Sequence, residues 1–335
     1  MRMRTLGRTG LRVSPVALGT MNFGPETAED DAHRILSAAT DAGINLVDTA
    51  DVYGADANRT VADHDPQKGR TEEIVGAWLQ DAPGRRDQTV LVTKAYGRMG
   101  PGPNDMHLSS VHLRRACEAS LRRLGTDHID VFLLHHVDRE TGWAEIWETL
   151  SDLRQEGKIR YAGTSNFAAW QLVQGQCAAE ARHLLGIVVE QSLYNLMERR
   201  VELEVLPACR HYGIGVMPYS PLNSGLLAGI LAKQQAGQTA ARSASSRAVD
   251  NLDARRAALE SYEGLCREIG QPPAVVGQAW LCHQPGVTAP VIGARTMDHL
   301  EAGIAAARLS LDEEVLKRLD DFFPGPGTAP EAYAW

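Results

Sequence analysis

Short runs of β-branched and aliphatic residues recur along the chain and alternate with longer stretches whose apolar residues have helical spacing. Runs that are apolar at nearly every position are typical of strands buried on both faces of a parallel sheet. The predicted strands are residues 16–19, 44–47, 89–93, 129–134, 159–163, 187–190, 214–218 and 289–292. Eight such strands alternating with helices predict an α/β fold of the (β/α)8 type, the TIM barrel.

Helical periodicity is clearest at residues 31–42, 71–79, 110–124 and 143–154. We expect Thr71 to cap the second of these helices, because two glutamates follow it in the first turn. Residues 2–14, with a turn at Gly10, are predicted to form a β-hairpin that closes the bottom of the barrel. Residues 311–322 are predicted to form an extra C-terminal helix.

A doubly wound sheet divided between two domains is the alternative architecture. It is less favoured, because no linker or composition break divides the chain. We therefore expect a single domain over residues 1–335. The chain exceeds the about 250 residues typical of such a barrel, and loop insertions account for the surplus.

Three long segments that follow predicted strands are expected to define the substrate pocket, because these loops form the functional face of a barrel. They are residues 55–70 with His64, residues 98–108, and residues 229–250 with Arg242 and Arg247. For the last segment, a lid over a cofactor and a disordered stretch are both compatible with the composition. The tail, residues 323–335, is too rich in turn formers for a helix and is expected to fold back over the barrel mouth or an outer surface.

The overall composition narrows the class of protein. The formal net charge of −8 and the lack of a basic tract argue against a nucleic-acid partner. No signal-peptide core is present and no apolar run approaches about 20 residues, so we expect neither secretion nor a membrane span. Single cysteines without metal-ligand spacing indicate reduced thiols in a cytoplasmic protein without a metal site. They are Cys117, Cys177, Cys209, Cys266 and Cys282.

Polar side chains follow three neighbouring strands of the predicted barrel. Asp48 and Tyr53 follow the second strand, Lys94 follows the third, and His135 follows the fourth. Parallel strands expose their C-terminal ends on one face, so these groups should meet there. An isolated aspartate or histidine at a strand end is more often a cap or a structural group, but the combination predicts a site of proton transfer.

The phenol is the expected proton donor, although its ordinary pKa near 10 makes it a poor one at neutral pH. The ammonium of Lys94 is expected to lower the pKa of Tyr53, and Asp48 to keep Lys94 charged and in place. His135 would orient the oxygen that receives the proton. His136 is expected to face the loops or the surrounding helices, because adjacent strand residues point to opposite faces, and the two imidazoles should not share a metal ion.

Several segments resemble the aldo-keto reductase superfamily, and the resemblance covers nearly the whole chain. They are residues 18–24 (LGTMNFG), 48–54 (DTADVYG), 157–166 (GKIRYAGTSN), 190–195 (EQSLYN), 218–222 (PYSPL) and 292–296 (IGART). The resemblance implies a (β/α)8 barrel that binds NADPH. It also implies that Asp48, Tyr53, Lys94 and His135 form the catalytic tetrad.

The resemblance further implies a set of cofactor-binding residues. Ser165, Asn166 and Gln191 would hold the nicotinamide carboxamide, and the ring would stack on Tyr219. A serine and an asparagine after a strand are also a common helix start, but their coincidence with Gln191 and Tyr219 favours the cofactor. The other implied contacts are Gly19, Thr20, Met21, Asp48, Ser220, Pro221, Leu222, Ser224, Gly225, Ile292, Gly293, Arg295 and His299.

The sequence departs from the family pattern near the end that binds the adenosine of the cofactor. Ala302 and Gly303 stand where an acidic or amide residue followed by asparagine is usual, and His299 stands where glutamine or arginine is usual. These changes remove polar contacts, so NADH is kept as an alternative cofactor. We favour NADPH because Arg295 is retained, and an arginine fork suits the 2′-phosphate.

The predicted function is the reduction of an aldehyde or ketone with hydride from NADPH. The chain is similar to actinobacterial aldo-keto reductases, a group that includes reductases of keto-deoxysugars, and the polar loops suit a hydroxylated substrate or broad aldehyde detoxification. The alternative is a nicotinamide-binding, redox-sensing partner like the β subunits of potassium channels, favoured by a stable tetramer. An oligomer is compatible with either function, and a non-catalytic sugar-binding barrel is the least favoured.

Overall fold

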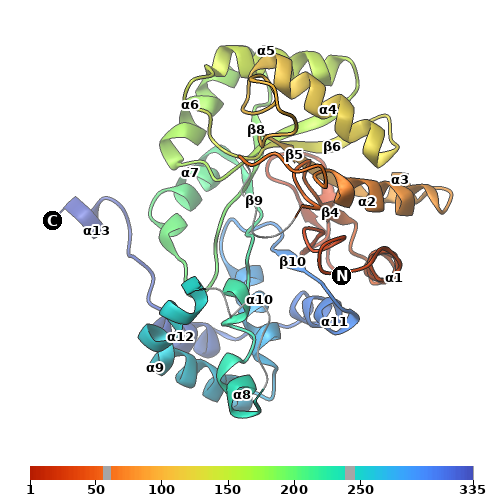
Figure 1. The fold of residues 1–335 in the computed structure, drawn as a ribbon. Coiled ribbons are helices and arrows are strands. Elements are labelled where there is room, and N and C mark those ends of the chain that lie inside the picture. Colours follow the sequence, from red (N-terminus) through yellow and green to blue (C-terminus); the bar gives the residue numbers. More distant parts are fainter. Residues whose placement is uncertain (56–61, 238–245, 335) are drawn as a thin grey trace.

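The computed structural model describes residues 1–55, 62–237 and 246–334. Eight parallel strands form one curled sheet in the order β10-β3-β4-β5-β6-β7-β8-β9, which is chain order apart from the return of β10 beside β3 (Figure 1). The strands are β3 Ala17–Gly19, β4 Leu46–Asp48, β5 Val90–Ala95, β6 Ile129–Leu134, β7 Ile159–Ser165, β8 Ile187–Gln191, β9 Gly215–Val216 and β10 Val291–Gly293. The predicted (β/α)8 barrel is confirmed.

The barrel closes between β9 and β10 without a regular ladder. Val216 forms an isolated parallel bridge with Val287, and the N–H of Val291 donates to the carbonyl of Pro218 at 2.8 Å. β9 is shorter than the predicted strand at residues 214–218, because regular pairing with β8 covers only Gly215 and Val216. Each of the eight predicted runs nevertheless overlaps a strand.

Helices surround the strands on the outside (Figure 1). The main ones are α1 Glu29–Asp41, α2 Arg70–Gln80, α4 Ser110–Leu124, α5 Trp143–Gln155, α6 Ala169–Glu180, α7 Val205–Tyr212, α10 Pro273–His283 and α11 Met297–Ala306. Shorter or additional helices are α3 Arg85–Gln88, η1 Arg200–Glu202, η2 Asn223–Gly225, α8 Ile230–Gln235, α9 Ser246–Glu268, α12 Glu313–Phe322 and α13 Glu331–Ala334. The four helices with clear periodicity and the extra C-terminal helix are all present within a few residues of their predicted bounds.

Thr71 does not cap α2. The helix begins one residue earlier, and its N-cap is Gly69, whose φ of 94° only glycine adopts readily. The N–H of Gly69 donates to the carbonyl of Tyr53 at 2.9 Å, so this turn fixes where the loop after β4 ends. The hydroxyl of Thr71 instead donates to the carbonyl of Phe23 at 2.8 Å and joins α2 to the loop after β3.

The N-terminal hairpin consists of β1 Arg4–Thr5 and β2 Arg12–Val13, paired antiparallel. Its close approach to the barrel is at Gly7, not at Gly10. A Cβ on Gly7 would lie 2.3 Å from the carbonyl oxygen of Val188 and 2.8 Å from that of Gly213, and its φ is +53°. These partners lie near the starts of β8 and β9, so the turn seals the end of the barrel opposite the strand C-termini.

Apolar side chains fill both the barrel and the layer between barrel and helices. The interior cluster includes Leu46, Val92, Val131, Leu133 and Met217, all with zero exposure. One outer cluster joins the strands to helices α4 to α12. A second joins them to α1, α2 and α11.

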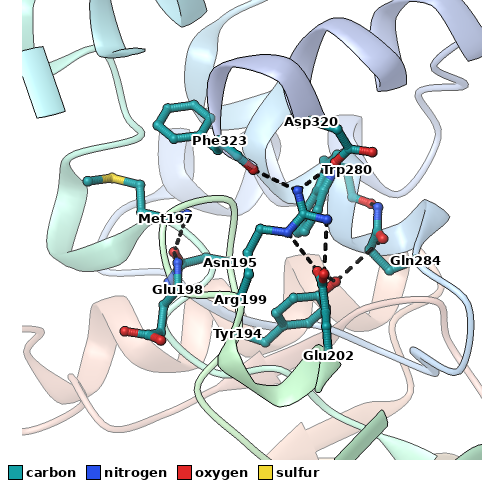
Figure 2. A network of polar contacts seen from close by, with 10 residues as sticks. All are labelled: Tyr194, Asn195, Met197, Glu198, Arg199, Glu202, Trp280, Gln284, Asp320 and Phe323. Atoms are coloured by element: carbon teal, nitrogen blue, oxygen red, sulfur yellow. Dashed lines mark hydrogen bonds and ion pairs between the residues drawn. The ribbon is translucent and has the colours of Figure 1, made fainter. Parts of the chain in front are cut away.

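Arg199 connects the C-terminal helix to the loop that follows β8 (Figure 2). Its guanidinium donates to Glu202 at 2.7 Å, to Asp320 of α12 at 2.7 Å and to the carbonyl of Phe323 at 2.7 Å. The same group lies 5.0 Å from the centre of a Trp280 ring. We call this set of contacts the Arg199 clamp.

Parts of two predicted loops lie outside the described residues, and the tail differs from its prediction. Residues 56–61 of the first loop and residues 238–245 of the third, with Arg242, lie outside the described residues. The third loop contains α8 and the start of α9, and the alternatives of lid and disorder are not decided. The tail was expected to lack a helix but ends in the single-turn α13, which lies at the periphery with Tyr333 63% exposed (Figure 1).

The five cysteines are unpaired in the structure: Cys117, Cys209 and Cys266 are buried, Cys282 is partly buried and Cys177 is exposed. None of the helices in the described ranges combines the length and the hydrophobicity that a bilayer-crossing segment requires.

Candidate active site

The predicted polar groups meet at the C-terminal ends of β4, β5 and β6. Asp48 is the last residue of β4, Lys94 lies near the end of β5, and His135 follows β6 directly. Tyr53 lies in the turn after β4. Asp48, Lys94 and His135 are 2%, 0% and 8% exposed, while Tyr53 is partly buried at the rim.

Lys94 is the centre of this group. Its Nζ donates to Asp48 Oδ2 at 2.8 Å, to the carbonyl of Thr49 at 2.8 Å and to Tyr53 Oη at 3.2 Å. An ammonium has three N–H donors, so these contacts account for all of them. The arrangement fixes both the orientation of the lysine and the position of the phenol oxygen.

The electrostatics of Lys94 keep it charged. Burial lowers the pKa of its ammonium, but the charge of Asp48, the phenol of Tyr53 and the hydrogen bonds to both outweigh that effect and raise the pKa above its ordinary value. The prediction that Asp48 holds Lys94 in the charged form agrees with this geometry.

The Lys94 ammonium lowers the pKa of Tyr53, as expected, but it does not set the net shift. Burial raises the pKa of the phenol and outweighs the opposing effect of the Lys94 ammonium, so the net shift is upward from 10. The charge of Asp48 adds to the upward shift. Tyr53 therefore keeps its proton at neutral pH, instead of approaching the phenolate form.

His135 is a neutral imidazole. Burial, followed by the charge of Lys94 and the neighbouring His136, holds its pKa well below 6.5. The ring lies edge-on to Tyr53, with centroids 5.9 Å apart and an interplanar angle of 81°. Its Nδ1 is buried and has no hydrogen-bond partner among the described residues.

His136 contacts the loop after β5, as expected, but it also stacks on His135 and does not point to the opposite face. The two rings are stacked, with centroids 5.2 Å apart and an interplanar angle of 13°, and His136 also contacts Tyr96 at 5.3 Å. The strand rule does not apply here, because β6 ends at Leu134 and the backbone is no longer extended and alternating. No group of three or more metal-ligating side chains occurs in the described residues.

The residues expected at the nicotinamide form one hydrogen-bonded set with the polar groups above. Gln191 Nε2 donates to Asp48 Oδ1 at 2.8 Å, and Ser165 Oγ donates to the carbonyl of Gln191 at 2.9 Å. Asn166 Nδ2 donates to the carbonyl of His135 at 3.1 Å and accepts at Oδ1 from Tyr219 Oη at 2.8 Å. The structure thus brings all four residues together at the mouth of the barrel.

Asn166 has an unusual backbone. Its φ is 65°, a left-handed conformation that asparagine tolerates better than other side chains. The N–H of Asn166 donates to the carbonyl of Gln191 at 3.0 Å, which ties the turn after β7 to the end of β8. The sequence pattern did not predict this turn, because it depends on the neighbouring strand.

The strands β3 and β10 bring further predicted residues next to Asp48. Gly19 is in register with both Asp48 and Gly293, and Ile292 precedes Gly293. Thr20 Oγ1 donates to the carbonyl of Asp48 at 3.0 Å. Met21 is 48% exposed at the rim and has no polar contact to the group.

The residues expected at the pyrophosphate form a tight turn after β9. Ser220 and Ser224 both have left-handed φ, of 53° and 55°, and Gly225 has a φ of 94°. Asn195 Nδ2 donates to the carbonyl of Ser220 at 3.0 Å. Pro221 and Leu222 lie within this turn, so the predicted pyrophosphate segment is continuous with Tyr219 at the mouth.

Arg295 and His299 lie at the start of α11, at some remove from the polar groups around Lys94. Arg295 forms an ion pair with Glu26 at 3.0 Å. His299 is exposed, and its pKa is lowered by burial of part of the ring and then by the positive charges of Arg295 and Lys233. The guanidinium therefore has a carboxylate partner, which the sequence did not indicate.

The departures at Ala302 and Gly303 lie on the side of α11 that packs against β10. A Cβ on Gly303 would lie 2.3 Å from Cδ1 of Ile292, so a side chain there requires the end of the isoleucine to move. Gly303 is buried and Ala302 is partly buried.

Sequence reasoning missed three charged residues near these groups. Glu190 and Asp51 are completely buried, and burial raises the pKa of both, that of Glu190 to about 7. The sequence feature that could have revealed them is a carboxylate within or beside the apolar run of a predicted strand. Lys233 of α8, which acts on His299, gave no signal, because only the fold brings α8 near α11.

Comparison with known proteins gives the family. A sequence model of the Aldo/keto reductase family matches residues 15–323. An uncharacterized oxidoreductase of Bacillus subtilis, YrpG, is 47% identical over 98% of this chain and 98% of its own length. A probable voltage-gated potassium channel subunit beta of Arabidopsis thaliana is 32% identical over 99% and 100%, and versiconal hemiacetal acetate reductase of Aspergillus parasiticus is 31% identical over 96% and 96%.

A match of this extent, together with a (β/α)8 barrel whose strand ends gather Asp48, Tyr53, Lys94 and His135, places the chain in the Aldo/keto reductase family as an NAD(P)H-dependent oxidoreductase.

Proposed function

We propose that this protein reduces the carbonyl group of an aldehyde or ketone with NADPH, and that Tyr53, Lys94, Asp48 and His135 carry the reaction. The observation that supports this best is the position of the Lys94 ammonium between the Asp48 carboxylate and the Tyr53 phenol, at 2.8 Å and 3.2 Å. A buried lysine that contacts a phenol oxygen in this way suits a site of proton donation.

Bound NAD(P)H supplies a hydride to the carbonyl carbon, and the carbonyl oxygen then takes up a proton. Tyr53 donates that proton from Oη, which leaves a phenolate. Lys94 stabilises the phenolate because its ammonium already contacts the oxygen. Asp48 does not give up a proton in this scheme; it keeps the ammonium charged and oriented.

His135 positions the carbonyl oxygen. Its depressed pKa makes it neutral, and Nδ1 has no acceptor within reach in the described structure, so the proton is better held at Nε2. An Nε2–H beside the phenol would give the carbonyl oxygen two donors. A pair of preorganised donors of this kind lowers the barrier by a few kcal/mol.

The donors and acceptors near Asp48 fit a nicotinamide. Ser165, Asn166 and Gln191 offer hydroxyl and amide groups that match both the C=O and the NH2 of a carboxamide. Tyr219 offers an aromatic face beside them. The turn from Ser220 to Gly225 has left-handed φ at Ser220, Asn223, Ser224 and Gly225, a backbone conformation of the kind that forms anion-binding concavities for pyrophosphate oxygens.

The preference for NADPH over NADH rests on the positive charges around α11. Arg295 and Lys233 both act on His299, so these side chains would meet near a 2′-phosphate. Glu26 opposes this, since its carboxylate pairs with Arg295 at 3.0 Å. We therefore expect a preference for NADPH that is modest, with measurable use of NADH.

For the substrate, we propose a hydroxylated carbonyl compound such as a keto-sugar. The polar loops beside Tyr53 support this choice: Lys68 donates to the carbonyls of Asp63 and Arg98, at 2.6 Å and 3.1 Å, and so joins the loops after β4 and β5. The free cysteines agree with a reducing compartment, so we also propose a cytoplasmic location.

The test is stopped-flow oxidation of NADPH and NADH by the purified protein with nitrobenzaldehyde, a diketone and a keto-sugar. Rapid oxidation of NADPH with any of these supports the reductase, and the order of kcat/KM ranks the substrate classes. Failure to bind either dinucleotide would contradict the cofactor assignment, while binding without turnover would contradict the reductase.

A second function is favoured by the relative named as a probable potassium channel subunit beta, which is similar over its whole length. In that case the barrel would bind nicotinamide and sense redox state as a partner of a membrane channel. A stable tetramer in solution with extremely slow cofactor turnover would favour this function over the reductase.

A further inference from the structure

Glu190 is a buried carboxylate that follows three apolar residues in β8. The preceding residues of β8 are Ile187, Val188 and Val189, and Glu190 itself has zero exposure. A buried carboxylate is unfavourable unless several hydrogen bonds compensate it. Packing alone would be served by another valine, so the charge calls for a different explanation.

Three donors surround the carboxylate. Thr164 Oγ1 donates to Oε2 at 2.5 Å, while Ser192 Oγ and the N–H of Phe167 donate to Oε1 at 2.7 Å and 3.2 Å. Thr164 and Phe167 lie on either side of Ser165 and Asn166. Ser192 follows Gln191 directly. The carboxylate thus holds both ends of the turn after β7 and the end of β8.

The held segments carry the groups expected at the nicotinamide. Asn166 has a left-handed φ of 65°, and the N–H of the next residue, Phe167, is fixed by Glu190. The N–H of Tyr219 donates to the carbonyl of Ser192 at 2.9 Å, so the aromatic face depends on the same segment. The carboxylate itself makes no contact with Asp48, Tyr53, Lys94 or His135 in the hydrogen bonds of the described residues.

We propose that Glu190 is a positioning residue for the cofactor: its carboxylate holds Asn166 and Gln191 in the geometry that binds the nicotinamide carboxamide. The inference rests on the proposed function. It names a residue that affects cofactor affinity through the segments it holds and not through direct contact with the cofactor.

Titration of Glu190 supplies a readout that a purely structural residue would lack. Burial outweighs its hydrogen bonds and raises its pKa to about 7, so it changes charge within the range of ordinary assays. A protonated carboxyl turns one acceptor into a donor and disturbs one of the three contacts. The charge of Glu190 affects the pKa of two other titratable groups, Tyr219 after β9 and Cys209 on α7. Burial raises the pKa of both groups, so they stay neutral between pH 6 and pH 8.

The experiment compares the Kd for NADPH of the full-length parent, Glu190→Gln and Thr164→Val, by quenching of protein fluorescence at pH 8 and pH 6. We expect Glu190→Gln to weaken binding about tenfold or more at pH 8, as for the loss of hydrogen bonds to a charged group. The ratio of the two Kd values should narrow at pH 6, because the parent then loses its own carboxylate. Effects of pH on the dinucleotide are common to both proteins and cancel in the ratio.

Controls separate positioning from stability. Thr164→Ser keeps the hydroxyl and should bind like the parent, while Thr164→Val should weaken binding. Glu202→Gln alters a carboxylate of the Arg199 clamp that accepts hydrogen bonds from Tyr194 and Arg199, and it should lower the melting temperature without changing the Kd. If Glu190→Gln does not fold, the pair of Thr164 variants carries the test.

Two results would overturn the proposal. One is an unchanged Kd in Glu190→Gln and Thr164→Val, and the other is an equal change in Glu202→Gln. The parent is measured first: if it binds no dinucleotide, the proposed function itself fails, and a parent that binds and turns over NADPH while the variants bind equally well contradicts only the role of Glu190.

Discussion

At the scale of the residue, Tyr53 and Lys94 have different roles in the proposed proton transfer. The phenol has a raised pKa, so it stays protonated until it donates, and the ammonium contacts the oxygen that will carry the negative charge. Lys94 therefore stabilises the phenolate that forms on proton transfer more than it affects the protonated phenol. This differs from a site in which the donor is partly ionised beforehand.

Replacement of Tyr53 by phenylalanine is expected to abolish turnover, because the ring remains but the proton donor is lost. A fall in kcat of about 100-fold or more corresponds to the usual contribution of a general acid. The Kd for NADPH should change little, since the binding groups are on β7 and β8. Steady-state kinetics and fluorescence quenching check both values, and normal kcat in this variant would refute the assignment of the acid.

Replacement of Asp48 by asparagine is expected to affect stability as well as activity. Lys94 is completely buried, and its ammonium would lose the charge that compensates it. Removal of one partner of a buried pair costs about 3–5 kcal/mol. Urea unfolding measures the effect, with Glu73→Gln as the control, since Glu73 is half-exposed where it pairs with Arg70 and should change stability by less than about 1 kcal/mol.

At the scale of the element, α4 packs under the loop after β5 through a buried histidine. His112 is 2% exposed, its Nε2 lacks a partner in the described structure, and its ring forms a hydrogen bond with the backbone of Asn104. Burial lowers the pKa of this imidazole from 6.5 to about 4. Burial among the apolar residues of α4 therefore makes the neutral imidazole the form that the folded protein favours.

Stability should fall on acidification because of this residue. Between pH 6.5 and about 4 the unfolded chain binds a proton at His112 that the folded chain does not, so the contribution is complete above pH 6.5 and is lost as pH falls through that window. The maximum loss is about 3 kcal/mol. His135 titrates in the same direction, so His112→Leu should reduce but not remove the slope of unfolding free energy against pH; an unchanged slope would contradict the prediction.

At the scale of the whole molecule, the Arg199 clamp joins the C-terminal helix to the barrel. Helix α12 follows the last βα unit, and the guanidinium reaches it from the loop after β8 (Figure 2). The side chain of Arg199 is only 11% exposed, so its ion pairs are better shielded from water than those at the surface. The clamp supports the fold at a distance from the site.

Arg199→Ala is expected to lower the free energy of unfolding by about 3 kcal/mol, as for a broken buried ion pair. Arg318→Ala is the matched control, because its partner Glu268 is 60% exposed and such pairs contribute about 0–1 kcal/mol. Calorimetry gives the melting temperatures. A Kd for NADPH equal to that of the parent should accompany the loss of stability, and equal stability of the two variants would contradict the role of the clamp.

The sequence by itself determined the order of strands and helices and the identity of the polar groups. Apolar runs such as 129–134 must be buried, and a residue such as His135 at the end of such a run must lie at the end of a strand, so local pattern was sufficient. It could not give the cap at Gly69 or the stacking of His135 on His136, because both depend on where neighbouring segments turn.

Only the tertiary structure decided the electrostatics. The net pKa of Tyr53, the partner of Arg295 and the three donors around Glu190 come from residues far apart in the chain. Burial and distance set these energies, and neither is encoded in the spacing of residue types along one strand. The sequence therefore specified which groups are present, and the closed barrel specified which of them are charged, paired and within reach of one another.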